Sequence, residues 1–435
     1  MERKIAKELL TFIAQSPSSF HAVQSITDIL DKNGFHRLAE CEQWDLTPGK
    51  YYVTRNRSSV AAFYIPGNKF LNYQIIACHS DSPAFKIKEH GEIVVDRAYT
   101  KLNTEVYGGM LFAPWFDRPL SIAGRVLIRE NARLVTKLVN VDHDLLVIPN
   151  LAIHMNREAN SGYTYNAQKD LLPLFGDENA KGRLMDIVAE CAGISRTSIA
   201  GSDLFLYNRM DGTIWGSDGE FLSSPRLDDL QCAFASLKGF LQADNPDSAS
   251  LFTVFDNEEV GSSTKQGAAS SFLSDVLRRI NRTLGGDEES YCTRLANSFM
   301  VSADNAHAVH PNHPEKSDPE NRVYLNRGIV IKYNANQKYT TDGVSSAIFR
   351  TICEQAKIPY QVFTNRSDMA GGSKLGSISN TQAAMNTVDI GLAQLAMHSP
   401  YETGGVMDTC FMAVAAEAFY NARISCETDG VYVVH

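Results

Sequence analysis

An apolar run followed at once by acidic residues marks the segment LFTVFDNEEVGSS, residues 251–263. The apolar part is typical of a buried strand, and Asp256, Glu258 and Glu259 lie within the four positions that follow it. A charge at the end of a buried strand costs several kcal/mol unless it is paired or bound to a metal ion. The segment is therefore either a solvated turn or part of a metal-binding or catalytic site.

Ligand-type side chains follow other apolar runs in the same way. They are His79 and Asp81 after YQIIAC, Asp304 after SFMVSA and His398 after TVDIGLAQLAM, with Asp228 and Asp229 at a helix start in SSPRLDD. In open α/β sheets ligands bind beyond the carboxyl ends of the strands, so these segments would bring histidines and carboxylates to one edge. Imidazole and carboxylate together are ligands of zinc, cobalt and manganese. Each residue alone is a weak signal, and the repeated pattern favours a metal site.

The elements that must position these residues change in character twice along the chain. Residues 1–90 read as an amphipathic helix followed by strands, and residues 91–224 as short alternating strands such as SIAGRVLI and RLVTKLVNV. In residues 225–435 helices and strands alternate, which indicates a mostly parallel sheet flanked by helices. We therefore expect a discontinuous α/β catalytic domain, residues 1–90 and 225–435, into which a β-rich domain, residues 91–224, is inserted.

Composition restricts the class of protein. The 435 residues are 44% hydrophobic and 21% charged, as in soluble globular proteins, and the net charge of -9 argues against nucleic acid or an anionic membrane as a partner. No stretch reaches the roughly 20 apolar residues of a membrane span. The eight cysteines lie singly without a CxxC pair, which argues against a disulfide framework and indicates a reducing cytoplasm.

The order of these motifs resembles the aspartyl aminopeptidase family, the eighteenth family of metallopeptidases, along nearly the whole chain. The resemblance is carried by SPSSFHAV, ACHSDSPAFKIK, NLAIHMNR, SPRLDDL, FDNEEVGS, SADNAHAVHPN, IKYNANQKYT and VDIGLAQLAMHSPYETG. It implies an aminopeptidase-type α/β domain holding two divalent metal ions, with an inserted β-rich domain used in oligomer assembly. Because members of that family form tetrahedral dodecamers, we expect a homo-oligomer, a dodecamer.

Carried over motif by motif, the resemblance implies two zinc ions, or cobalt or manganese, on the ligands His79, Asp228, Glu259, Asp304 and His398. Asp228 would bridge the two ions, and Asp81 would fix the orientation of His79 from behind. Adjacent residues leaving a strand point in different directions, so Glu259 can bind a metal while Glu258 acts as general base toward water. Two ions about 3.5–4 Å apart lower the pKa of bound water toward 7.

Further residues enter through the same resemblance. His154, in NLAIHMNR, matches a histidine that reaches the active site of a neighbouring subunit, with a direct metal contact or a buried structural histidine as the alternatives. His307, Lys332 and Tyr339 match residues that contact substrate. A lysine in the S1 pocket suits an acidic P1 side chain, although a lysine at a strand end is otherwise commonly solvated. Lys374, in MAGGSKLGS, departs from the family pattern of a small hydroxyl residue and leaves the P1 preference open.

The sequence therefore predicts a metal-dependent aminopeptidase that releases N-terminal residues, mainly Asp or Glu, from peptides. A broad-specificity two-metal aminopeptidase or an amide deacylase shares the same ligands and is the alternative. A metal-binding scaffold without catalysis is a more distant one, and Glu258, which binds no metal in this scheme, argues against it. The motifs G-x-S-x-G, P-loop, G-x-G-x-x-G and H-E-x-x-H are all missing, which argues against serine hydrolases, nucleotide binders and zincins.

Overall fold

The computed structural model describes residues 2–369, 371–372 and 375–435, so Lys374 of the glycine-rich segment lies outside the described residues. The chain folds into two compact units. The first comprises the chain up to Asp81, Gly212–Met397 and Glu402–His435, and the second comprises Ser82–Asp211 and His398–Tyr401. Each unit has its own hydrophobic core.

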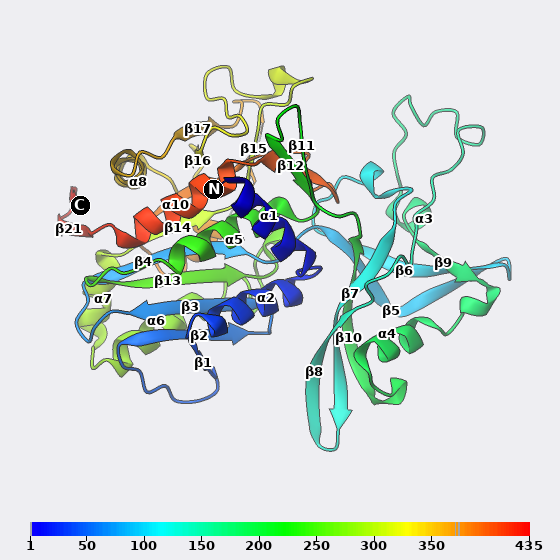
Figure 1. Cartoon of the computed structure of the whole chain (residues 1–435), viewed down its shortest axis with the longest axis horizontal. Helices are drawn as coiled ribbons and strands as arrows, with labels where there is room; N and C mark the ends of the chain where they lie inside the picture. The colour runs from blue at the N-terminus through cyan, green and yellow to red at the C-terminus, as the bar shows by residue number, and fades with distance from the viewer. Residues whose placement is uncertain (1, 370, 373–374) are drawn as a thin grey trace. The chain divides into compact units, whose positions relative to one another are not determined.

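The first unit is built on a nine-stranded sheet, which is drawn in Figure 1. In spatial order its strands are β1 (His36–Leu38), β2 (Gly49–Arg55), β3 (Ser59–Ile65), β13 (Ser248–Phe255), β4 (Asn72–His79), β14 (Phe299–Ala303), β18 (Asn386–Gly391), β16 (Ile329–Tyr333) and β17 (Tyr360–Thr364). The central strands β13, β4, β14 and β18 are all parallel. The mostly parallel α/β sheet that the sequence predicted is confirmed.

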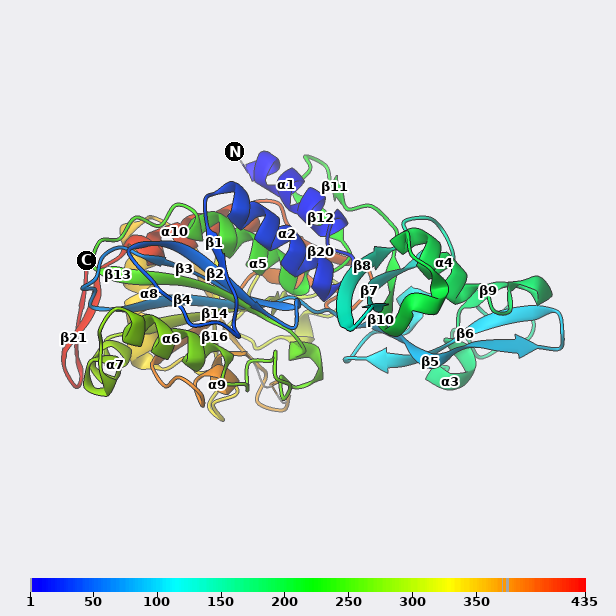
Figure 2. The same ribbon diagram turned by 90° about the horizontal axis from the view of Figure 1, so that it is seen from below.

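Helices cover both faces of this sheet (Figure 2). The helices of the first unit are α1 (Glu2–Ala14), α2 (Ser19–Lys32), α5 (Leu227–Phe240), α6 (Phe272–Thr283), α7 (Glu288–Ala296), α8 (Gly343–Gln355), α9 (Leu375–Ser379) and α10 (Asp408–Asn421), with short 3-10 helices η4 (Glu258–Val260) and η5 (Pro314–Lys316). Side chains alternate between the two faces. On β13, Phe252 and Val254 pack with α1, α2, α5, α8 and α10, whereas Leu251 and Phe255 pack with α6, α7 and α9. Strands buried on both faces explain the continuous apolar runs.

Two smaller sheets complete the first unit. One has the order β11 (Thr213–Trp215), β12 (Phe221–Ser224), β20 (Glu402–Gly405), β19 (Ala393–Leu395) and β15 (Ala306–His307), and the other pairs β21 (Ile424–Thr428) with β22 (Val431–Val434). The sequence predicted one strand over TVDIGLAQL, but the structure divides it into β18 and β19 of different sheets. At the break, a Cβ added to Gly391 would lie 2.0 Å from the carbonyl oxygen of Asp304, so only glycine allows this close approach.

The second unit is a six-stranded sheet in which every neighbouring pair is antiparallel. Its order is β8 (Arg133–Asn140), β7 (Leu120–Glu130), β10 (Ile199–Asn208), β5 (Ala84–Val95), β6 (Tyr99–Tyr107) and β9 (Leu174–Asp177), accompanied by α3 (Ala167–Asp170), α4 (Leu184–Ala192) and the 3-10 helices η1 (Ala113–Trp115), η2 (Glu178–Ala180) and η3 (Arg196–Ser198).

The limits of this β-rich unit differ from the expected 91–224. The unit begins at Ser82, because β5 already starts at Ala84 and pairs with β6 and β10. The chain leaves the β-rich unit after Asp211, because β11 pairs with β12 and β12 pairs with β20 in a sheet of the first unit. Strand pairing, which local sequence patterns do not reveal, decides where one unit ends and the other begins.

No helix in the described part of the chain is both long enough and apolar enough to cross a membrane.

Candidate metal centre

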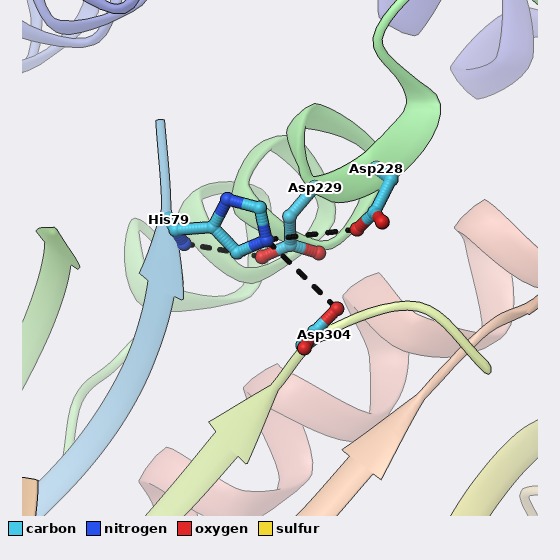
Figure 3. Close-up of side chains that lie close together, drawn as sticks. All are labelled: His79, Asp228, Asp229 and Asp304. Carbon is cyan, nitrogen blue, oxygen red and sulfur yellow. Dashed lines mark hydrogen bonds and ion pairs between the residues drawn. The ribbon is translucent and has the colours of Figure 1, made fainter. Parts of the chain in front are cut away.

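Four buried side chains converge at the carboxyl edge of the central sheet in the first unit (Figure 3). His79 is the last residue of β4, Asp304 follows β14 directly, and Asp228 and Asp229 stand in the first turn of α5. Each is at most 1% exposed. One ligand atom from each of the four lies within 4.8 Å of the others, so the carboxyl ends of β4 and β14 and the start of α5 bring these residues to one point.

Contacts of both ring nitrogens define the orientation of the His79 imidazole. Nδ1 lies 3.0 Å from the backbone carbonyl oxygen of Asp81, to which it donates when protonated. Nε2 then faces the carboxylates, 3.6 Å from Asp228 Oδ1 and 3.9 Å from Asp304 Oδ1. The backbone N–H of His79 also donates to Asp229 Oδ2 at 3.2 Å. A hydrogen bond to one ring nitrogen that leaves the other for a cation is the usual arrangement of a metal-binding histidine.

Asp81 connects His79 to the acidic turn after β13. Its carboxylate oxygens accept hydrogen bonds from the backbone N–H groups of Glu258, at 3.1 Å, and Glu259, at 3.2 Å. Ligand atoms of Glu258 and Glu259 lie within 4.8 Å of one another and of His79. Asp81 therefore contacts the histidine through its backbone carbonyl and the turn of the two glutamates through its carboxylate.

The start of α5 departs from helical geometry where it carries Asp228 and Asp229. Both residues have non-helical backbone angles, and the peptide bond between them is cis. The backbone N–H of Asp228 donates to Oε2 of Glu402 at 3.0 Å, and Glu402 is itself buried. The contact with Glu402 holds the backbone at Asp228, and the carboxyl groups of both aspartates lie beside His79.

The electrostatics of this cluster favour positive charge. Burial alone would lower the pKa of His79, but hydrogen bonds to Asp228, Asp304 and Asp81 outweigh it and hold that pKa well above the ordinary value. The pKa of Asp229 is raised well above its ordinary range, because burial disfavours its charged form, while the charge of His79 acts in the opposite direction. Buried carboxylates around one imidazole fit a divalent cation such as zinc in donor type and in charge.

Comparison with known proteins identifies the family. A model of the aminopeptidase I zinc metalloprotease family (M18) matches residues 12–420. A protein named probable M18 family aminopeptidase 2 from Clostridium acetobutylicum is 48% identical over 430 residues, which are 97% of this chain and 99% of that relative. The chain belongs to the M18 family. It is a metalloaminopeptidase, as the sequence predicted.

Solved structures agree with this M18 assignment. A cryo-electron microscopy structure of the Ape4 and Nbr1 complex matches with a TM-score of 0.93 and 34% identity, covering 96% of this chain and 86% of that one. The structure of an S. cerevisiae mApe1 dodecamer matches with a TM-score of 0.85 and 28% identity, covering 96% of both chains. The fold expected for an M18 aminopeptidase is thereby confirmed.

Two predicted site residues of this M18 chain fall in the second unit. His398 lies there with its Nδ1 2.5 Å from the carbonyl oxygen of Gly109. His154 stands in an exposed turn between Leu151 and Asn160, so the alternative of a buried structural histidine is wrong for this chain. Their roles as metal ligand and as active-site histidine stay predictions.

The predicted substrate residues occupy different environments. His307 is exposed at the end of β15, whereas Tyr339 is buried, and Phe363 lies beside both rings. Lys332 is 1% exposed, and its Nζ donates to the carbonyl oxygens of Asp304, at 2.6 Å, and Asn305, at 3.3 Å. The alternative of a solvated strand-end lysine is therefore wrong.

Three residues in or beside the cluster are not among the site residues that the sequence predicts. Asp229 carries a visible signal, its place in the Asp-Asp pair at a helix start, but the resemblance implies a ligand role only for Asp228. Glu402 gave no signal, because it is 174 positions from the residue whose backbone it binds. Asn305 follows Asp304 directly, but a buried asparagine cannot be told from an exposed one by its position after a strand.

Proposed function

We propose that this M18 enzyme releases N-terminal acidic residues from peptides by hydrolysis at a centre that holds two divalent cations. The observation that carries the proposal is the buried convergence of His79, Asp228, Asp229 and Asp304, with Glu258 and Glu259 beside it. Its donor set is imidazole and carboxylate, as in catalytic metal sites. Zinc is favoured because the family is one of zinc metalloproteases, with cobalt and manganese as further candidates.

The side chains that would hold the cations are His79, Asp228, Glu259, Asp304 and His398. When bound, two cations supply Lewis acidity that makes water nucleophilic near neutral pH and stabilises negative charge on the scissile carbonyl oxygen. Asp81 keeps Nε2 of His79 directed into the site through the contact of its backbone carbonyl with Nδ1. The carboxylates that would bind the cations and the contact that orients His79 thus all come from this chain.

Glu258 is the proposed general base. Its carboxylate would take a proton from the attacking water and return it to the departing amine, which is the work of a positioned carboxylate in such hydrolyses. The hydrogen bonds from the backbone N–H groups of Glu258 and Glu259 to Asp81 support this proposal, because they fix the turn that carries both side chains beside His79.

Lys332 is the proposed determinant of acidic specificity, together with His307 and Tyr339. An ammonium group has three N–H donors, and two of those of Lys332 go to backbone carbonyls. No ion pair of Lys332 occurs among the residues that the structure describes. Burial raises the pKa of Asp389 on the neighbouring strand, whereas the charge of Lys332 acts in the opposite direction. A buried cation that forms no ion pair favours a ligand that brings a carboxylate.

A substrate panel tests the proposed specificity on enzyme of defined metal content. We expect N-terminal Asp and Glu amides to be hydrolysed with the highest kcat/KM, above Leu and Ala amides. Lys332→Met should lower the ratio of kcat/KM for Asp over Leu by about tenfold to a hundredfold, the worth of a charged hydrogen bond. Lys238→Met is the matched control, because Lys238 pairs with Glu8 on the outer face of α5.

The ratio is the informative quantity, since Lys332 also holds the loop of Asp304 and its loss would slow every substrate. Equal rates on all four amides would support a broad aminopeptidase, and hydrolysis of acylated amines alone would support a deacylase. A normal Asp/Leu ratio in Lys332→Met would contradict the role given to Lys332.

A homo-oligomer, a dodecamer, is the proposed assembly, in the cytoplasm. The S. cerevisiae mApe1 structure is described as a dodecamer, and the eight cysteines of this chain are all unpaired, as suits a reducing compartment. We further propose that His154 of the β-rich unit completes the active site of a neighbouring subunit. The exposure of His154 in a single chain supports this role, because its ring is accessible to another subunit.

Mixed assembly tests the contribution of His154 across subunits. His154→Ala and Glu258→Gln chains, each nearly inactive alone, should recover part of the activity when assembled together, because some sites then receive an intact histidine and an intact base from different chains. Differential tags confirm that the oligomers are mixed. If confirmed mixed oligomers stay as inactive as their parents, His154 does not act in a neighbour's site.

A further inference from the structure

We infer that Asn305 is a positioning residue that holds the segments carrying Asp304 and Asp228 at a fixed separation. The inference rests on the proposed metal centre, to which both aspartates belong. Asn305 touches neither substrate nor cation in this scheme and acts through the backbone on either side of the site.

The side chain of Asn305 joins the end of β14 to the start of α5. Asn305 follows Asp304 in the chain, and its Nδ2 donates at 3.1 Å to the carbonyl oxygen of Leu227, the residue before Asp228. The two bridged positions are 78 residues apart in sequence. A single amide therefore connects the backbones next to two carboxylates that both face Nε2 of His79.

Further contacts leave this amide no freedom to turn. Nδ2 also donates to Oε1 of Gln394, while Oδ1 accepts from Sγ of Cys232, 3.0 Å away on α5. Asn305 is 1% exposed. Both the donor and the acceptor of the amide are thus used, and both contacts with α5 would be lost if the side chain were removed.

The backbone of the same loop is held from its other side. Lys332 Nζ donates to the carbonyl oxygens of Asp304 and Asn305, and the N–H of Asp304 donates to the carbonyl oxygen of Ile390 at 3.1 Å. Gly391 leaves no space for the loop to retreat, since even a Cβ there would collide with the Asp304 carbonyl. These contacts hold the loop against the sheet. The side chain of Asn305 holds it against α5, through both Nδ2 and Oδ1.

This arrangement predicts that Asn305 preorganises the cation site. Like-charged carboxylates repel one another when no cation is bound, so the site needs a rigid backbone to keep Asp304 and Asp228 close. Outer partners of metal ligands commonly contribute about tenfold to a hundredfold to metal affinity. Removing Asn305 should weaken cation binding by that amount even where the fold persists.

The test compares zinc affinity in three full-length proteins: wild type, Asn305→Ala and Asn245→Ala. Asn245 is the matched control, because it is also buried and its Nδ2 donates to Gln74 and to the carbonyl oxygens of Tyr420 and Ala422. Zinc dissociation constants come from competition with a chelator, and Tm is measured with and without zinc. Asn305→Ser is prepared in parallel, so that a folded variant is at hand if Asn305→Ala does not assemble.

We expect both alanine variants to show a lower Tm without zinc, but only the Asn305 variants to bind zinc about tenfold to a hundredfold more weakly. Unchanged zinc affinity in a folded Asn305 variant overturns the inference and leaves the metal centre intact. An equal loss in Asn245→Ala also overturns it, since general loosening would then explain the effect. Failure of the wild type to bind zinc overturns the proposed metal centre itself.

Discussion

Chelation is expected to abolish peptide hydrolysis, and zinc, cobalt or manganese should restore it. In the proposed mechanism the nucleophile is water, and Glu258 can deprotonate it readily near neutral pH only where bound cations have lowered its pKa. The ligands must be deprotonated to bind a metal. Because nearby carboxylates raise the pKa of His79 in the cation-free protein, protons compete for its Nε2, and metal affinity should fall as the pH is lowered.

The experiment measures activity on an N-terminal Asp amide before stripping, after stripping and after addition of each metal. Elemental analysis establishes the metal content of every sample, and magnesium serves as the control cation, since it prefers oxygen ligands over imidazole. Full activity in protein shown to be free of metal would refute a metal-dependent mechanism.

Glu258→Gln is expected to reduce kcat by at least about a hundredfold while the protein keeps its metal and its fold. The amide preserves the size of the side chain but cannot take a proton from water. Glu259→Gln should instead lose metal, because it removes a charged ligand. Glu258 and Glu259 are adjacent, and the backbone N–H of each donates to the Asp81 carboxylate. Each variant is therefore the control for the other.

Metal content, kcat and Tm measured on both variants separate these roles. A Glu258→Gln protein that loses metal as readily as Glu259→Gln would show that both glutamates are ligands. A Glu258→Gln protein with normal kcat would require another base.

The main sheet, and the edge at which the site lies, could be predicted from local patterns of apolar residues. Runs such as YQIIAC and SFMVSA are apolar throughout because β4 and β14 are buried on both faces, and such runs are visible without any knowledge of their partners. Parallel strands place their carboxyl ends together, so His79 and Asp304 could be predicted to meet. The Asp-Asp pair before a helix likewise indicated where α5 would begin.

The neighbours that hold these ligands in place become visible when the chain is folded. Asn305 and Glu402 act on Asp228 through contacts that span 78 and 174 positions, and a local pattern of polar and apolar residues contains no information about such partners. For Lys332 the sequence leaves a solvated strand-end lysine open beside the predicted substrate contact, whereas the folded chain buries it and directs it to the carbonyl of Asp304. Periodicity reports how deeply a segment is buried, whereas the direction of a side chain beyond a strand end depends on the elements that pack around it.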